Sequence, residues 1–412
     1  MTTWYEGEGY DLDQRPFLRP PGPEKEDVRP FGSFAETCAI GLATGALSNV
    51  PGLPPLDVVR SRTIRMLTAV ALSNRANGGN WGGSRPGTHG TASTNVAAPA
   101  MLAAWLLWPA LSPEQQAYVV NMARFEVDSL MDVPVRYLRD RAGRTVGRPD
   151  SAAEELAWNE VILSLAVNMF PDHPRRRAWE QRIARSTLAA WARPADVESP
   201  ARYHGLPLSE WVDGSNLNPD GTLANGGIAV HPFYMTALAN SVFQLAPYAL
   251  AGRPGLNVVR FNADAVYQAL VNNRYRVADG YEPPGGTMYI PGSPDIYFPL
   301  GSNKSPVAFI AFGFLDWVAG QLGADARVQP KASEWERRHV ERALAMRGVR
   351  AGRPSLTGAA GVSDDEYWVA YWGARAHLMS WLSNQVGFPL HDFPLGALPR
   401  SGRQKGGPDR GR

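Results

Sequence analysis

Repeated pairs of predicted helices are the feature that most constrains the fold of this chain. Apolar runs with helical spacing begin near Ser33, Thr91, Ser151, Pro232, Lys304 and Asp364. Most of these runs are followed by a second helix after a short break, and long polar, Gly-rich loops separate the pairs. Helical hairpins repeated in this way predict an all-α protein, and specifically an α/α toroid, a complete or incomplete (α/α)6 barrel.

Each long loop precedes the first helix of a pair, so a toroid would place all of these loops on one rim. They span residues 77–91, 137–150, 194–231, 280–303 and 348–363. Loops held on a rigid scaffold commonly carry binding and catalytic residues. We therefore expect the function to reside on that rim, around a central cleft.

Capping signals indicate where several helices begin. The capping-box pattern S-x-x-E begins at Ser33, Ser151, Ser333 and Ser363, and Ser112 is followed by Pro113 and Gln115. The acidic members of these boxes, such as Glu36 and Glu154, are then expected to complement helix N-termini rather than to act in catalysis.

The length of the chain is compatible with one large domain if helical hairpins are added around a ring. With 412 residues it exceeds the size at which single cores usually stop growing, about 250 to 300 residues, but a closed toroid escapes that limit. We expect an extended arm over residues 1–32, the toroid domain over 33–390, and a C-terminal segment over 391–412. The Gly- and Arg-rich end of that segment is expected to be disordered.

Composition excludes several classes of partner and cofactor. Lys plus Arg number 41 against 39 acidic residues, so no global field attracts nucleic acid or an anionic membrane. The single cysteine, Cys38, permits no intramolecular disulfide, and motifs for nucleotides, nicotinamide cofactors or zinc are absent from the sequence. We expect no cofactor, no metal and no membrane span. The N-terminal residues lack a signal-peptide pattern, which predicts a cytoplasmic protein whose partner is a small molecule or oligosaccharide.

Two segments carry side chains suited to a sugar-like ligand. In the loop 77–85, Asn80, Trp81 and Arg85 combine an amide, an exposed indole and a guanidinium, which can stack on a sugar and bond its hydroxyls. In the last helix, Trp368 shares a face with residues 371, 372 and 375. That face forms either an aromatic wall of the cleft or ordinary core.

The start of the third helix pair carries a dense polar cluster over residues 150–160. Glu155 and Asn159 are four residues apart and share one helical face, so both can point into the centre of a ring. A buried Glu155 would have a raised pKa and act as a general acid. The alternative, equally weighted, is a structural polar network between two hairpins.

The segment 209–234 is the most specific stretch of the chain. It places Trp211, Asp220, Asn225, His231 and Tyr234 in one long loop that ends on the first turn of a helix. Loops of this length inside compact proteins are usually functional. The side chains are candidates for binding and proton transfer.

This segment resembles the rim motif of chondroitin- and hyaluronate-type polysaccharide lyases and of α/α-toroid relatives of the heparinase II/III kind. That motif reads Asp-Gly-Ser-aromatic-x-x-His and is followed by a Tyr. Residues 213–215 match its opening letters, and residues 220–223 stand at the better distance from Tyr234, near the position of the family's catalytic tyrosine. Asn225 and Gly226 stand where the family has its histidine, and His231 follows five residues later.

The resemblance implies β-elimination at a uronic acid. Asn and Arg side chains would neutralise the carboxylate, while Tyr234 and His231 would move protons. Glu155 and Asn159 complete the candidate catalytic set. Trp211, Asp220 and Asn225 join the candidate substrate-binding set, together with Tyr289 and Asp295 of the loop 280–303, for which packing is an equally supported role.

Three functions follow, in order of preference. The first is a carbohydrate-active enzyme with lyase or glycosidase-like acid/base chemistry, the lyase being favoured. The second is a biosynthetic dehydratase, isomerase or cyclase that acts on an apolar or mixed small molecule. Two features support it: the missing motif histidine and the aromatic face around Trp368 and Trp372. The third is an inactive carbohydrate-binding toroid. The sequence leaves the oligomeric state open.

Overall fold

The computed structural model describes residues 25–83, 92–146, 150–299, 306–346, 348–350, 353–355 and 366–395. Helices dominate this part of the chain, which confirms the all-α class. The longer helices are α2 (Lys25–Thr44), α3 (Leu56–Leu72), α4 (Ala92–Leu106), α5 (Pro113–Met131), α6 (Ala153–Met169), α7 (Arg176–Ala190), α12 (Ala263–Val271), α13 (Pro306–Leu322), α14 (Ala332–Ala345) and α15 (Glu366–Gln385).

Short elements fill the long connection between α7 and α12 and the turns elsewhere. The short α-helices are α8 (Leu208–Trp211), α9 (Pro232–Met235), α10 (Ala237–Phe243) and α11 (Leu245–Leu250). The 3₁₀ turns are η1 (Arg75–Asn77), η3 (Trp108–Ala110), η4 (Pro194–Asp196), η5 (Asn257–Arg260), η6 (Val277–Asp279) and η7 (Pro284–Gly286).

The described strands form two-stranded pairs only. β1 (Arg139–Asp140) pairs with β4 (Gly214–Ser215), β2 (Arg202–Tyr203) with β3 (Leu206–Pro207), and β6 (Gly348–Arg350) with β7 (Arg353–Ser355), all antiparallel. The fourth pair is parallel and joins β5 (Gly255–Leu256) to β8 (Leu390–His391) near the C-terminal end of the described chain.

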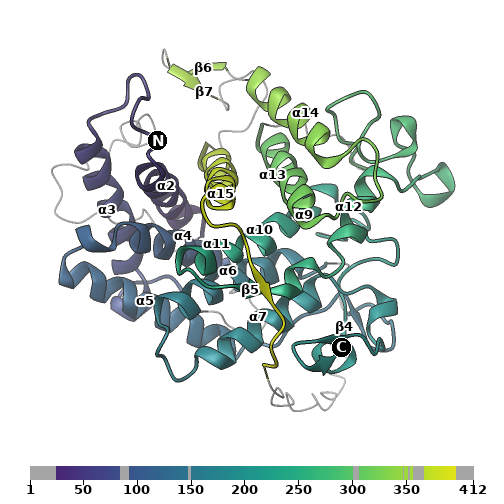
Figure 1. Cartoon of the computed structure of the whole chain (residues 1–412), viewed down its shortest axis with the longest axis horizontal. Helices are drawn as coiled ribbons and strands as arrows, with labels where there is room; N and C mark the ends of the chain where they lie inside the picture. The colour runs from purple at the N-terminus through teal and green to yellow at the C-terminus, as the bar shows by residue number, and fades with distance from the viewer. Residues whose placement is uncertain are drawn as a thin grey trace, which may run out of the picture.

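The helices contact one another in a cyclic order. α2 packs on α4, α4 on α6, α6 on α10, α10 on α13, α13 on α15, and α15 again on α2 (Figure 1). A second helix packs beside the first in most pairs: α3 beside α2, α5 beside α4, α7 beside α6 and α14 beside α13. The hairpin pairing predicted from the apolar pattern is thus present in these contacts.

Burial differs between the first and second helices of a pair because their sequences differ. Residues of α6 from Val161 to Val167 are all buried, as expected for a helix that is apolar on every side. In α14, Trp335 and His339 are buried while Glu334 and Arg337 face solvent as an ion pair. The first helices therefore supply most of the core and the second helices cover it.

The helix boundaries confirm one predicted capping box and correct others. Ser112 accepts a hydrogen bond from the backbone N–H of Gln115, whose side chain bonds back to Ser112, and Pro113 begins α5. The box at Ser33 was wrong, because α2 already begins at Lys25. Residues 25–32 are therefore helical rather than part of an extended arm.

Two further predicted boxes do not form. The N-cap of α14 is Lys331, which places Ser333 inside the helix. The N-cap of α6 is Ala152, and the Ser151 hydroxyl instead accepts from the N–H of Ala153 at 3.2 Å. Ser363, the rest of the predicted arm (1–24) and the tail from residue 396 lie outside the described residues. No helix in the described ranges has the length and apolarity needed to cross a bilayer.

Candidate functional site

His231 and Tyr234 lie side by side where the long loop enters α9. His231 immediately precedes the helix and is anchored by its backbone N–H, which donates to the Leu223 carbonyl at 2.7 Å. Pro232 begins α9, a position that suits its fixed backbone angle. The imidazole stands edge-on to the Tyr234 ring, with 4.5 Å between ring centroids. The two candidate proton-transfer residues are therefore in direct contact.

The surroundings keep both side chains uncharged near neutral pH. Burial lowers the pKa of His231, and its Nδ1 atom is buried without a hydrogen-bond partner among the described residues. Burial, together with the negative charges of Glu154, Asp150 and Glu155, raises the pKa of Tyr234 to about 12. A neutral imidazole can accept a proton and a protonated phenol can donate one.

Three carboxylates thus approach this pair from the start of α6. Asp150 precedes the helix, and Glu154 and Glu155 lie in its first turn. The condition for a general acid at Glu155, a buried side chain, is not met: its side chain is 22% exposed, and Arg136 Nη1 donates to it at 2.6 Å. Glu155 therefore shapes the electrostatics near Tyr234 while its own charge is matched by an arginine.

Asn159 lies one turn further into α6 and is buried. Its side-chain oxygen accepts a hydrogen bond from Thr94 Oγ1 of α4 at 2.9 Å. This contact fits the alternative of a polar network between two hairpins. Of the polar pair in α6, only Glu155 acts electrostatically on Tyr234.

A buried ion pair joins the first and last described helices. Arg375 of α15 donates to both carboxylate oxygens of Glu36 in α2, at 2.6 and 3.0 Å, and its third nitrogen donates to Asn240 of α10 at 3.1 Å. The guanidinium also lies 3.9 Å from the centre of the Tyr371 ring. The capping-box pattern predicts instead that Glu36 complements a helix N-terminus. The signal that was overlooked is an acidic residue inside an apolar helical run.

Trp368 lies one turn before Tyr371 and is half-buried. The Arg29 guanidinium of α2 stacks over its ring at 5.0 Å, and Tyr371 stands edge-on to it at 5.3 Å. Trp372 is buried in the core beside Phe314. The predicted aromatic face is therefore divided between core packing and a cation–π contact made by the protein itself.

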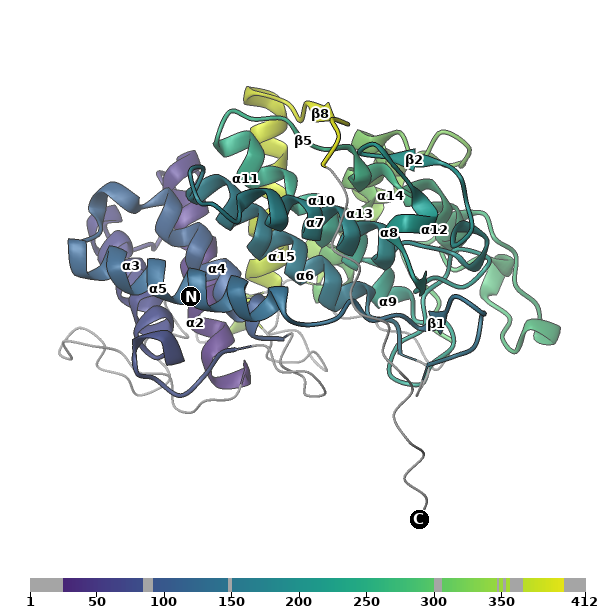
Figure 2. The same cartoon turned by 90° about the horizontal axis from the view of Figure 1, so that it is seen from below.

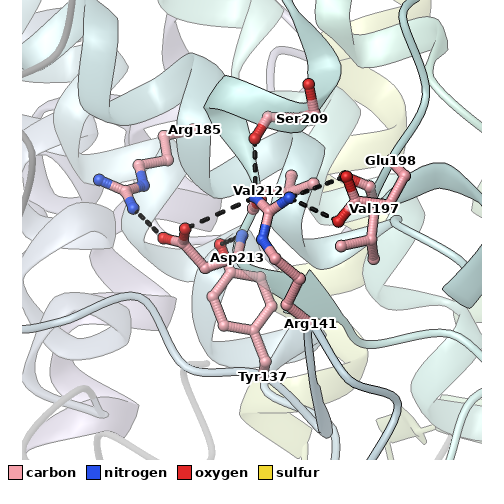
Figure 3. Close-up of polar contacts among 8 residues, drawn as sticks. All are labelled: Tyr137, Arg141, Arg185, Val197, Glu198, Ser209, Val212 and Asp213. Atoms are coloured by element: carbon pink, nitrogen blue, oxygen red, sulfur yellow. Dashed lines mark hydrogen bonds and ion pairs between the residues drawn. The ribbon is translucent and has the colours of Figure 1, made fainter. Parts of the chain in front are cut away.

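The opening letters of the lyase-like motif anchor the long loop to the scaffold. Asp213 is paired with Arg185 of α7, and its backbone N–H donates to the Tyr137 hydroxyl at 3.1 Å (Figure 3). Arg141 reaches the same region and donates to the Ser209 and Val212 carbonyls, each at 2.7 Å. These contacts give Asp213 a structural role.

Three aromatic candidates are buried rather than exposed to a ligand. The Trp81 indole is 4% exposed and donates to the Val70 carbonyl at 3.0 Å, so its predicted exposure was wrong. Trp211 is fully buried and donates to the Tyr203 carbonyl at 2.9 Å. Tyr289 is fully buried as well. In each case the polar tip of the ring finds a partner inside the protein.

Tyr289 belongs to a buried network that the sequence did not reveal. Its hydroxyl and that of Tyr267 both donate to Asp316 Oδ1, at 2.8 and 2.9 Å. The other oxygen of Asp316 lies 2.6 Å from Nδ1 of His339 in α14. All four side chains are buried, so the network joins α12, α13 and α14 and leaves no face for a substrate.

The remaining candidates lie in turns. Asn80 is exposed. Asp220 is exposed and accepts hydrogen bonds from Thr222, and its charge acts on Tyr275 and Tyr281 rather than on Tyr234. Asn225 exchanges backbone hydrogen bonds with Ile228 across a glycine turn, and Asp295 is half-buried. Arg85 lies outside the described residues.

Glu160 is a further buried acid near the candidate site. Burial raises its pKa to about 8, although two side chains donate hydrogen bonds to it. These are Ser241 of α10 and Gln244, the residue that follows α10. Its Oε1 atom has no partner in the described structure. Because the residue is fully buried, it is a structural acid that is protonated at neutral pH.

Comparisons with known proteins give no relative: no family model matches the sequence, no curated protein matches it significantly, and no solved structure matches its fold significantly. Among the described residues, no group of His, Cys, Asp and Glu side chains is placed to hold a metal ion.

Proposed function

We propose that this protein is a carbohydrate-active enzyme that performs acid/base chemistry with His231 and Tyr234. The observation that carries the proposal is the contact between a half-buried neutral imidazole, whose buried Nδ1 atom has no partner among the described residues, and a phenol that stays protonated. His231 accepts a proton from the attacking hydroxyl or water. Tyr234 donates a proton to the leaving oxygen.

An α/α toroid is the architecture that we infer for this enzyme. The cyclic order of helix contacts from α2 to α15 and back to α2 supports it, as does the packing of second helices beside the first. In such a ring the first helices run in the same direction, which gathers their N-terminal ends on one rim. Tyr234, Asp150 and Glu154 all come from segments at those ends.

Electrostatics favour a neutral sugar over a uronic acid as substrate. The negative charges of Glu154, Asp150 and Glu155 all act on the Tyr234 hydroxyl. These charges would repel the carboxylate of a uronic acid substrate. Hydrolysis or transfer at a neutral glycoside is therefore the form of the chemistry that we propose, in place of the elimination implied by the lyase-like motif.

The alternative of a cyclase or dehydratase acting on an apolar substrate has weaker support. It depends on an aromatic face around Trp368 and Trp372. Arg29 covers the first ring and the core encloses the second. A cationic intermediate would have to displace Arg29 to use that surface.

A product screen tests the proposal. Purified protein would be incubated with neutral, amino- and uronate-containing oligosaccharides, and new reducing ends and unsaturated products would be measured. We expect reducing ends or transfer products from neutral glycosides. Unsaturated product from uronates alone would contradict the neutral-substrate proposal, and no product from any member of the panel would contradict the proposed activity.

A further inference from the structure

A polar cleft lies on the side of the molecule that faces away from α9. Its volume is about 820 Å³, within the usual range for small-molecule sites. It is bounded by the segment after η4, by η5 with the start of α12, and by the C-terminal segment 388–392. β5 and β8 mark this end at the top of Figure 2, while β1 and α9 lie low in the same view.

Parallel pairing of β5 with β8 builds one wall of the cleft. Leu256 is opposite His391 in this pair, and the N–H of Gly255 donates to the Pro389 carbonyl at 2.9 Å. A side chain at Gly255 would overlap the Cδ2 atom of Leu245, so the Leu245 side chain would have to move to admit it. The pairing holds His391 and Asp392 beside residues that precede them by more than a hundred positions.

Carboxylates dominate the charged lining. Asp196 and Asp264 each pair with an arginine, Arg193 and Arg327 respectively. Asp392 accepts from the backbone N–H of His204 at 2.6 Å, and within the described ranges neither lysine nor arginine pairs with it. Its side chain is 47% exposed. Asp392 is therefore the carboxylate in this cleft whose charge is not matched by a basic side chain.

The three carboxylates and Tyr203 line the same cleft. Burial raises the pKa of Tyr203, and the charges of Asp196, Asp392 and Asp264 raise it further. The Tyr203 ring stands edge-on to Phe261 at 5.4 Å, and Phe388 also lines the cleft. Aromatic rings and carboxylates together form the surroundings that organic ammonium groups prefer.

Two buried polar atoms in the lining have no partner in the described structure. They are Oδ1 of Asn257 and Nδ1 of His391. Burial lowers the pKa of His391 to about 4, so its ring is neutral at physiological pH. A buried acceptor without a partner is costly, and a ligand that donates hydrogen bonds removes that cost.

We propose that this cleft binds a small organic amine that carries additional hydrogen-bond donors. Its ammonium group pairs with Asp392 and lies against the aromatic lining, while its hydroxyl or amino donors reach Asn257 and His391. This binding site is separate from the His231–Tyr234 site and does not depend on the function proposed for it. Arg260, an exposed residue of the lining, opposes the ammonium charge and weakens its binding.

Calorimetric titration of the full chain at pH 7 tests the assignment, with glucosamine and spermidine as amine probes and glucose as the uncharged counterpart. We expect at least one amine to bind with a Kd of about 1 mM or tighter and glucose to bind at least tenfold more weakly, about the effect of losing one charged hydrogen bond. Asp392→Asn keeps the oxygen that accepts from His204, so we expect the fold to persist and amine binding to weaken about tenfold.

Matched variants distinguish amine binding in this cleft from a general effect of the protein's net charge on amine binding. Asp57→Asn removes the same charge from the exposed first turn of α3 and is expected to leave amine binding unchanged. Arg260→Gln is expected to tighten it. Absence of binding by both amines, equal binding of glucose, or unchanged affinity in Asp392→Asn would each overturn the proposal. None of these measurements requires turnover, so they are independent of the proposed enzyme activity.

Discussion

His231 is the residue whose surroundings most directly suggest proton transfer. Its ring is half-buried, touches Tyr234 and has a buried nitrogen without a described partner. Neutral imidazole is the form that accepts a proton. Desolvation disfavours its charged form and keeps that form scarce.

The first prediction concerns the pH dependence of turnover. Because burial lowers the pKa of His231, the base is available to a lower pH than an exposed histidine allows. We expect the acid limb of kcat/KM to have its midpoint below 6.5, and we expect no alkaline loss until pH approaches the Tyr234 pKa of about 12. A midpoint above 6.5 in initial-rate measurements would contradict the role given to His231.

The second prediction concerns Glu160 and stability. Its pKa is about 8 in the folded protein and about 4.5 in an unfolded chain, so unfolding releases a proton between these values. The free energy of unfolding contributed by this residue should therefore fall as pH rises from about 4.5 to 8, by a few kcal/mol at about 1.4 kcal/mol per pKa unit.

Glu160→Gln removes this titration while it keeps the shape of the side chain. Urea unfolding at pH 5 and pH 8 should show a larger loss of stability with pH in the parent protein than in the variant. Equal losses in the two proteins would show that Glu160 is ionised in the folded state.

At the residue scale, the sequence alone indicates which side chains meet only where they are close together in the chain. His231 and Tyr234 are three residues apart across a helix start, so local geometry brings them together. Trp81 and Trp211 are buried although a ligand-facing position was expected, whereas for Tyr289 burial agrees with the packing alternative. A polar-tipped aromatic ring in a Gly-rich loop is compatible with both exposure and burial, and only the tertiary partners decide.

At the scale of elements, a capping pattern predicted the start of a helix only where the residues before it are not themselves helical. Ser112 caps α5 because Pro113 fits the first turn and a 3₁₀ turn precedes it. Ser33 and Glu36 carry the same pattern, but α2 begins upstream at Lys25 and continues through Pro30, so tertiary packing overrides the local signal. Glu36 instead pairs with Arg375, a contact across 339 positions that no local pattern encodes.

The third prediction uses this difference between the two serines. Ser112→Ala removes the hydrogen bond to the N–H of Gln115 and is expected to lower the free energy of unfolding by about 1 kcal/mol. Ser333→Ala, a matched change at an exposed position inside α14, should lower it by much less. Equal effects in chemical denaturation would contradict the capping assignment.

At the scale of the whole molecule, one buried ion pair links the two ends of the described helical order. Glu36 and Arg375 are both almost fully buried and join α2 to α15. The sequence predicted the succession of hairpins but not this link, since the partner of a buried charge depends on how the last helix returns to the first.

The fourth prediction is that breaking this link destabilises the whole domain. Arg375→Met leaves the Glu36 carboxylate buried and unpaired, which typically costs about 3 to 5 kcal/mol. The double variant Glu36→Leu with Arg375→Met should be less destabilised than Arg375→Met alone, because no uncompensated charge remains. Glu334→Gln, at an exposed ion pair of α14, should cause little change in thermal unfolding.

The central claim, that His231 and Tyr234 form the acid/base pair of a carbohydrate-active enzyme, is tested most directly by one rate comparison. Initial rates on the best neutral glycoside would be measured for the parent protein, Tyr234→Phe and Tyr118→Phe, the last of which removes an exposed hydroxyl of α5. We predict a loss of about 100-fold or more for Tyr234→Phe, with unchanged thermal unfolding, and near-parental rates for Tyr118→Phe. Parental rates in Tyr234→Phe would contradict the claim.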